Sequence, residues 1–81
     1  MDESVFLQQM DELFDLEPGT LDLSCVIEET PGWSSLTFLG LIALVDEAYQ
    51  TAIKPRQLMQ HATFGELYSY LETRYSSSVV T

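Results

Sequence analysis

Apolar residues recur at helical spacing near the start of the chain. Within residues 4–16 they form one stripe, which consists of Phe6, Met10, Leu13 and Phe14. The opposite face is polar and carries Gln8, Asp11, Glu12 and Asp15. This pattern predicts an amphipathic helix whose acidic face lies in solvent. Pro18 and Gly19 oppose its continuation, so we expect the helix to end near Leu16.

The following segment, residues 17–33, is a long connection that is too apolar for a free linker. Its apolar members include Leu21, Leu23, Val26 and Ile27. We expect it to pack across the helices and to turn at Pro31 and Gly32. A connection of this length in a small domain is either functional or contains a short helical turn, and the pattern leaves both options open.

A second helix is predicted from Ser34, a preferred N-cap residue, to about Tyr49. One apolar stripe consists of Leu36, Leu39, Ile42, Val45 and Tyr49. A second stripe consists of Phe38, Leu41 and Leu44. A helix that is apolar around much of its circumference is either central in the core or contacts a partner.

Weaker signals organise the rest of the chain. Pro55 suits the first position of a short helix, and Thr63 with Glu66 has the spacing of a capping box before a last helix that reaches Tyr75. Residues 76–81 lack periodicity and are expected to fray. The sequence therefore predicts an all-α single domain of residues 1–75, a small bundle of three longer helices and one short helix, with a disordered tail.

Charge restricts the classes of partner. The chain of 81 residues has 13 acidic and three basic residues, a net charge of −10, and no basic residue precedes Lys54. We therefore expect basic protein partners and neither nucleic acid nor a membrane. The longest apolar stretch, residues 38–45, is far shorter than the roughly 20 residues that cross a bilayer. A single cysteine and the absence of a secretory pattern favour the cytoplasm.

Few side chains offer catalytic chemistry. With one histidine, His61, and one cysteine, Cys25, the sequence indicates neither a nucleophile beside a base nor a metal site. We expect His61 at the surface or at a helix cap, Cys25 as an inert packed thiol, and no enzymatic activity. Asp46 and Glu47 lie where a helix C-terminus mildly disfavours negative charge, which either partner recognition or simple solvation explains.

The run GWSSLT at residues 32–37 places a primary hydroxyl at a predicted helix N-terminus. Free amides and the helix dipole favour anions there, so a phosphate on Ser35 would lie in a favourable field. From spacing alone, ordinary capping by Ser34 and Ser35 is the simpler explanation.

Over residues 4–75 the sequence resembles the acyl carrier proteins, in which a long loop leads to an Asp-Ser-Leu signature at the start of the second helix. The matching pieces are LEPGTL (16–21), WSSL (33–36), VDEAY (45–49), IKP (53–55) and TFGEL (63–67), with Tyr70 and Leu71. The resemblance implies a four-helix bundle of acyl-carrier type. It also implies that a transferase, with its own Mg²⁺, moves 4′-phosphopantetheine from coenzyme A to Ser35.

The arm would then hold acyl groups as thioesters for fatty acid, polyketide or specialised lipid biosynthesis. The resemblance implies partial shelter for an acyl chain among Leu39, Ile42 and their neighbours. Partners would be the transferase and acyl-transferring or acyl-modifying enzymes with basic docking surfaces, which a monomeric carrier meets in turn. The residues expected to contact them are Ser34, Leu36, Thr37, Gly40, Asp46 and Glu47.

Two departures from the family pattern stand out. Ser34 replaces the usual aspartate, which preserves capping, leaves the efficiency of modification open and makes Ser34 a rival acceptor. The front of the second helix carries Thr37 and Gly40 where the family commonly has acids, which predicts altered partner recognition. Because glycine weakens a helix, close approach by a partner or by the arm would explain Gly40, as would simple tolerance.

Two other classes compete with this interpretation. One is an acidic helical interaction module without an arm, in which Ser35 serves as a cap; the other is a peptidyl or aminoacyl carrier protein. The acid-rich stretch before Lys54 predicts that added salt weakens binding to the transferase. Salt-independent binding would instead indicate apolar recognition through Phe38, Leu41 or Leu44.

Overall fold

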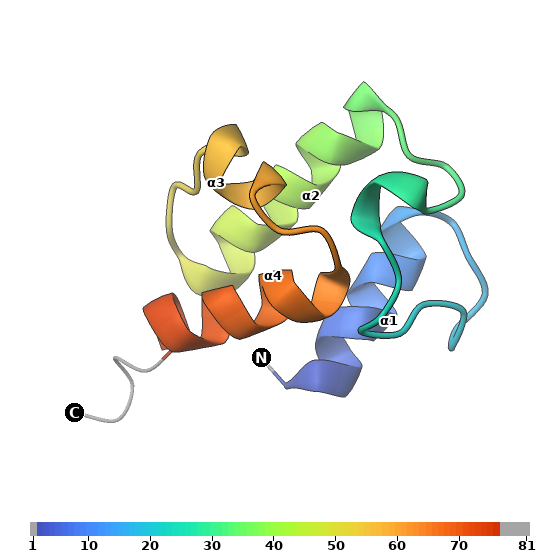
Figure 1. Cartoon of the computed structure of the whole chain (residues 1–81), viewed down its shortest axis with the longest axis horizontal. Coiled ribbons are helices and arrows are strands. Elements are labelled where there is room, and N and C mark those ends of the chain that lie inside the picture. The colour runs from blue at the N-terminus through green and yellow to red at the C-terminus, as the bar shows by residue number, and fades with distance from the viewer. Residues whose placement is uncertain (1, 77–81) are drawn as a thin grey trace.

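Four α-helices enclose one apolar core in the computed structural model, which describes residues 2–76 (Figure 1). They are α1 (Glu3–Leu13), α2 (Ser35–Tyr49), α3 (Pro55–Met59) and α4 (Phe64–Leu71). A 3₁₀ turn, η1 (Ile27–Glu29), interrupts the long connection, and a π-helical turn, η2 (Glu72–Ser76), follows α4. The prediction of an all-α bundle with three longer helices and one short helix is confirmed. None of these helices is long and apolar enough to cross a membrane.

The core lies where α1, α2 and α4 meet. Its fully buried members include Phe6, Met10, Leu41, Val45, Leu58, Phe64, Leu67 and Leu71. The ring of Phe6 packs on that of Tyr68, with centroids 5.2 Å apart. Burial of such side chains is the main source of stability in a domain of this size.

The first helix ends earlier than its periodicity predicts. α1 stops at Leu13, and Asp15 adopts a left-handed backbone conformation with φ 58°. The Leu16 amide donates to the Asp11 carbonyl (2.8 Å), and the Asp15 amide donates to that of Glu12 (3.1 Å). These two bonds form a Schellman motif, with an aspartate in the position where glycine is most common. The chain has therefore left the helix before Pro18.

The long connection contains the short helical turn that was one of the two options, and it packs on the start of α4. The Ile27 amide donates to the Ala62 carbonyl (2.9 Å), and the Phe64 amide donates to the Cys25 carbonyl (3.1 Å). The Gly65 amide donates to the Leu23 carbonyl (2.9 Å). These bonds fix the connection against the bundle, as its apolar composition predicts.

The prediction that Asp11 lies in solvent is wrong. Its side chain is 2% exposed, because the connection folds back over this part of α1. The two carboxylate oxygens accept bonds from the amides of Gly19 and Leu21, each 3.0 Å long. Asp11 thus ties the turn after α1 to the helix, while its neighbours Glu12 and Asp15 remain exposed as predicted.

Both later helix starts follow local sequence signals. Pro55 is the first residue of α3. The Thr63 hydroxyl accepts a bond from the Glu66 amide (3.1 Å), but the Glu66 carboxylate accepts from the Ala62 amide (3.2 Å), one residue before the expected donor. α4 itself is shorter than predicted, because η2 replaces its last turn. Of the predicted tail, residues 77–81 lie outside the described residues, and the domain boundary at residue 75 stays a prediction.

Candidate functional site

Ser35 is the first residue of α2 and therefore lies at the N-terminal end of this helix (Figure 1). Its side chain is exposed, and within residues 2–76 no group forms a hydrogen bond with its hydroxyl. Ser34, immediately before it, has an extended backbone (φ −160°, ψ 173°), which is the ordinary geometry of an N-cap. The chain therefore presents the Ser35 oxygen freely at the helix end.

The hydroxyl of Ser34 is engaged, unlike that of Ser35. It accepts a bond from the Thr37 amide (3.3 Å), while the Thr37 hydroxyl accepts one from the Ser34 amide (2.8 Å). This is the predicted cap in reciprocal form, with threonine in place of the usual Glu or Gln. The Thr37 hydroxyl also lies 3.1 Å from the Gly32 carbonyl oxygen, an acceptor for its proton. Thr37 therefore holds the loop–helix junction together.

Aromatic packing fixes this junction on the bundle. The Trp33 ring lies between Phe14 at the end of α1 (centroids 6.2 Å apart) and Phe38 in the first turn of α2 (5.6 Å). Gly32 takes a left-handed conformation (φ +90°), and the Trp33 amide closes the turn by donating to the Thr30 carbonyl (3.0 Å). The residues around Ser35 are thus held in place while its side chain stays accessible.

The electrostatic setting of Ser35 suits a phosphate ester. The first amides of α2, those of Ser35 and Leu36, precede the hydrogen-bonded ladder, and the positive end of the helix dipole lies there. No residue from 30 to 45 carries a charge. A phosphodiester on the Ser35 oxygen would therefore meet amide donors and no neighbouring carboxylate on its own helix.

The buried side of α2 combines residues of both predicted stripes. Leu36 is 78% exposed and Leu39 is 61% exposed, whereas Leu41 and Val45 are fully buried. Leu39 lies outside the interior, so the shelter implied for an acyl chain does not include it. Leu41 is equally excluded as a surface for apolar recognition. Because the helix is apolar nearly all round, its periodicity did not determine which side faces inward.

Gly40 lies where α1 packs closely on α2. A Cβ at this position would lie 2.7 Å from Cδ1 of Leu13, which is closer than van der Waals contact allows. Because Cδ1 is the tip of a flexible side chain, Leu13 would have to shift to admit this Cβ, and a role of Gly40 in partner binding stays a prediction.

The two acidic residues at the end of α2 have different surroundings. Asp46 is half-buried, and its Oδ1 accepts a bond from the Ile53 amide (2.9 Å) across the loop to α3. This bond gives the Asp46 carboxylate a structural role near the helix C-terminus, and a role of Asp46 in partner binding stays a prediction. Glu47 is exposed, and its role in partner binding stays a prediction.

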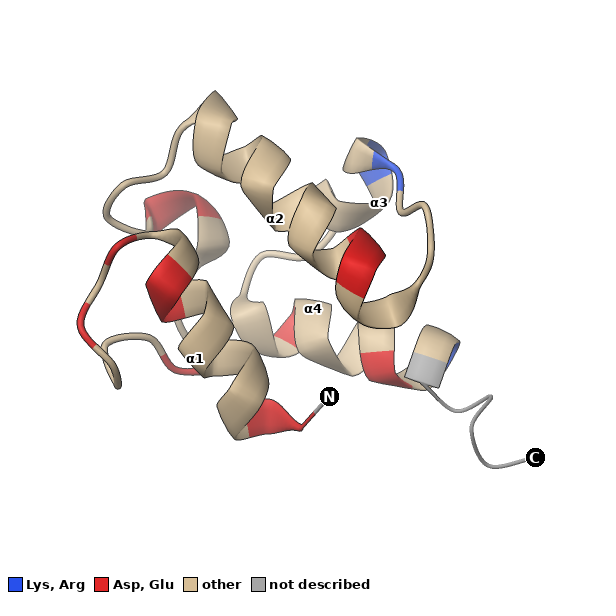
Figure 2. Ribbon diagram, turned by 180° about the vertical axis from the view of Figure 1, so that it is seen from behind, with Lys and Arg blue, Asp and Glu red and all other residues tan. Residues whose placement is uncertain are grey.

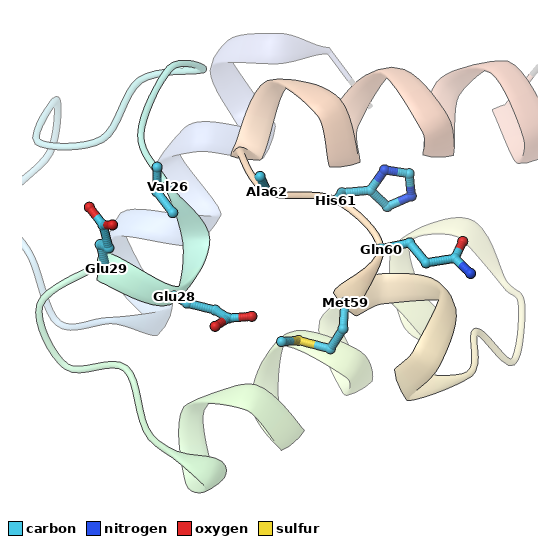
Figure 3. A pocket seen from close by; sticks show the side chains of 7 residues that line it. All are labelled: Val26, Glu28, Glu29, Met59, Gln60, His61 and Ala62. Atoms are coloured by element: carbon cyan, nitrogen blue, oxygen red, sulfur yellow. The ribbon is translucent and has the colours of Figure 1, made fainter.

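The single histidine lines a separate pocket of about 450 Å³ between η1 and the segment that links α3 to α4. Figure 3 shows Glu28 and Met59 facing each other across this pocket. His61 packs on Tyr70 with ring centroids 4.6 Å apart, and within the described chain its Nε2 atom is buried without a hydrogen-bond partner. No group of three or more His, Cys, Asp or Glu side chains among residues 2–76 is placed to bind a metal ion.

One tyrosine connects the end of α2 to η2. The Tyr49 hydroxyl donates to Oε2 of Glu72 over 2.6 Å. Burial, followed by this bond to the Glu72 carboxylate and its negative charge, raises the pKa of Tyr49 well above its ordinary value. The contact is structural and lies at the opposite end of α2 from Ser35.

Comparison with known families gives a match to the phosphopantetheine attachment site family over residues 32–71. The matched region begins at the turn before Ser35 and ends with the last residue of α4, so it includes the junction described above. No curated protein and no solved structure matched the chain.

Proposed function

Since the chain belongs to the phosphopantetheine attachment family of acyl-carrier type, whose prosthetic group is 4′-phosphopantetheine, we propose that it is an acyl carrier protein with the arm on Ser35. The single observation that carries this proposal is the difference between two adjacent hydroxyls. That of Ser34 is occupied in the helix cap, and that of Ser35 is exposed and unbonded within the described residues. An acceptor hydroxyl must be accessible to the enzyme that modifies it.

The residues present fit the group. A phosphodiester on Ser35 would lie at the positive end of α2, next to the first backbone amides and away from the charged residues of that helix. When bound, the arm supplies a terminal thiol that holds a substrate as a thioester. The chain itself supplies the attachment point and the rigid frame of α2.

The carrier acts by tethering. A flexible arm raises the local concentration of its substrate at each enzyme without tight protein affinity. We propose a monomer in the cytoplasm that takes no catalytic part itself, is loaded by a phosphopantetheinyl transferase, and serves enzymes of fatty acid, polyketide or specialised lipid biosynthesis. The net charge of −10 supports partners with basic surfaces, and Glu47 is the exposed carboxylate of α2 that such a partner would meet.

Intact mass spectrometry tests the attachment site. After incubation with coenzyme A, Mg²⁺ and a broad-specificity phosphopantetheinyl transferase, the wild-type chain should gain the mass of one arm. Ser35→Ala should abolish the gain, and Ser34→Ala should retain it. A gain that survives in Ser35→Ala and disappears in Ser34→Ala would move the site by one residue. No gain in the wild type would favour an interaction module without an arm.

The substrate class is tested on the loaded protein. Acyl-transferring enzymes should load the arm with acyl groups, whereas loading by amino-acid-activating enzymes instead would identify a peptidyl or aminoacyl carrier.

A further inference from the structure

The surface next to Ser35 is apolar. Leu39 and Ala43 follow Ser35 at intervals of four residues, so the three side chains lie along one face of α2, and all three are exposed. Leu36, the immediate neighbour of Ser35, is the most exposed large apolar residue of the described chain. We refer to Leu36, Leu39 and Ala43 as the apolar stripe of α2.

Charge is absent from this part of the helix. The same face reaches its first carboxylate at Glu47, twelve residues after Ser35, which corresponds to about 18 Å along the helix axis. The Debye length at physiological ionic strength is about 8 Å, so that carboxylate contributes little to a contact centred on Ser35. Figure 2 shows the acidic residues of α2 confined to its C-terminal part, whereas other acids lie on α1, on η1 and in the loops.

Any enzyme that esterifies Ser35 must bring its reacting atoms to the Ser35 oxygen. In doing so it covers Leu36 and Leu39, because one is the next residue in the chain and the other lies one turn further on the same face. A basic groove placed there would lose hydration and find no carboxylate on the first three turns of α2. An apolar groove would gain from the burial of two exposed leucines.

We propose, on the basis of the function proposed above, that the phosphopantetheinyl transferase docks on the apolar stripe of α2 through an uncharged, apolar groove. The net charge of −10 then acts at long range and speeds the encounter, while the stripe determines how long the complex lasts. The two contributions affect different rate constants and are separable by experiment.

Leu39→Glu distinguishes the two kinds of groove by the sign of its effect. An apolar groove predicts that the substitution lowers kcat/KM for arm transfer by about tenfold or more, since the loss of a hot-spot contact at the centre of an interface costs at least that factor. A basic groove predicts an unchanged or higher kcat/KM. The matched control is Val5→Glu, which adds the same charge at an exposed apolar residue (41% exposed) in the first turns of α1.

The assay follows the mass gain from coenzyme A with the same transferase, and thermal unfolding checks that each variant is folded. The expected result is a kcat/KM for Leu39→Glu that is about tenfold below that for Val5→Glu. Equal values for the two variants, or a faster Leu39→Glu, would overturn the proposal. A wild-type chain that gains no mass would instead refute the function proposed above, and with it the docking partner.

Salt provides the second measurement. Added salt should slow association of wild type and Leu39→Ala by the same factor in stopped-flow binding to the transferase, whereas Leu39→Ala should dissociate faster at every salt concentration. If the ratio of the wild-type affinity to the Leu39→Ala affinity approaches one as the salt concentration rises, the contact is a charged one. Sedimentation of the wild type at the assay concentration addresses self-association: a dimer that Leu39→Glu dissolves would assign the stripe to a second copy of the chain and overturn the proposal.

Discussion

The buried carboxylate of Asp11 should be one of the most sensitive positions in the molecule. Each of its oxygens accepts one backbone amide, from Gly19 and from Leu21, in the turn that follows α1. Asp11→Ala removes both acceptors and leaves the two amides without these partners, one of them buried. A hydrogen bond to a charged group contributes about 1.5 to 3 kcal/mol, so we expect the free energy of unfolding to fall by about 3 kcal/mol or more.

A loss of this size is a large fraction of the total stability of a small domain, which is typically about 5–15 kcal/mol. Since about 1 kcal/mol shifts the melting temperature of such a domain by roughly 4–8 °C, Asp11→Ala should melt at least about 12 °C below the wild type. Asp11→Asn should fall between the two proteins, because it keeps one acceptor oxygen and turns an NH₂ donor toward the other amide.

Glu12→Ala is the matched control, because it removes the same charge from the adjacent, exposed position of α1. It should stay within about 0.5 kcal/mol of the wild type. Urea unfolding followed by the fluorescence of Trp33, the single tryptophan, measures all three variants. If Asp11→Ala and Glu12→Ala have equal unfolding free energies, the bonds from Gly19 and Leu21 do not stabilise the fold and the reasoning fails.

The sequence predicted the helix starts better than the helix ends. Ser34, Pro55 and Thr63 mark the starts correctly, because capping depends on a few neighbouring residues and therefore leaves a local signature. The end of α1 depends on Asp15 adopting a left-handed conformation, which its side chain permits but does not require. The π-helical turn after α4 left no recognisable signal in the sequence.

Orientation of side chains was the second limit. The polar face of α1 contains both Asp11 and Glu12, and periodicity alone treats them alike; the fold distinguishes them because the connection returns over one and not the other. On α2 the apolar residues surround the helix, so the buried side was set by where α1 and α4 pack. A glycine at position 40 was the available signal, since it marks the side that α1 approaches.

At the candidate site, the sequence identified the junction but did not rank its two serines on physical grounds. The resemblance to the acyl carrier proteins indicated Ser35. The cap geometry adds an independent reason, because Ser34 and Thr37 satisfy each other's backbone amides and leave the Ser35 hydroxyl free within the described residues. Local spacing is compatible with capping by either hydroxyl, so only the three-dimensional arrangement of the junction distinguishes the two serines.

Three further predictions follow from individual contacts. Ser34→Ala should lower the free energy of unfolding by about 1 kcal/mol through loss of the N-cap, and urea unfolding should show Ser35→Ala close to the wild type. Gly40→Ala should raise the free energy of unfolding by less than the about 1 kcal/mol that helix propensity alone predicts, because the new Cβ would lie 2.7 Å from Cδ1 of Leu13 and that flexible side chain must shift; Leu13→Ala in the same chain should remove the cost of this shift, and a double-mutant cycle without coupling would contradict this. The last prediction concerns alkaline pH. The folded chain raises the pKa of Tyr49 above its ordinary value of 10.0, first through burial and then through Glu72, so between these two pKa values the unfolded chain loses a proton that the folded chain keeps. The free energy of unfolding is therefore unaffected by this group below about pH 10 and falls as the pH rises above it, and Tyr49→Phe should make that decline shallower. Urea titrations at a series of alkaline pH values measure the slope, and equal slopes for Tyr49→Phe and wild type would show that the raised pKa of Tyr49 does not contribute to the decline.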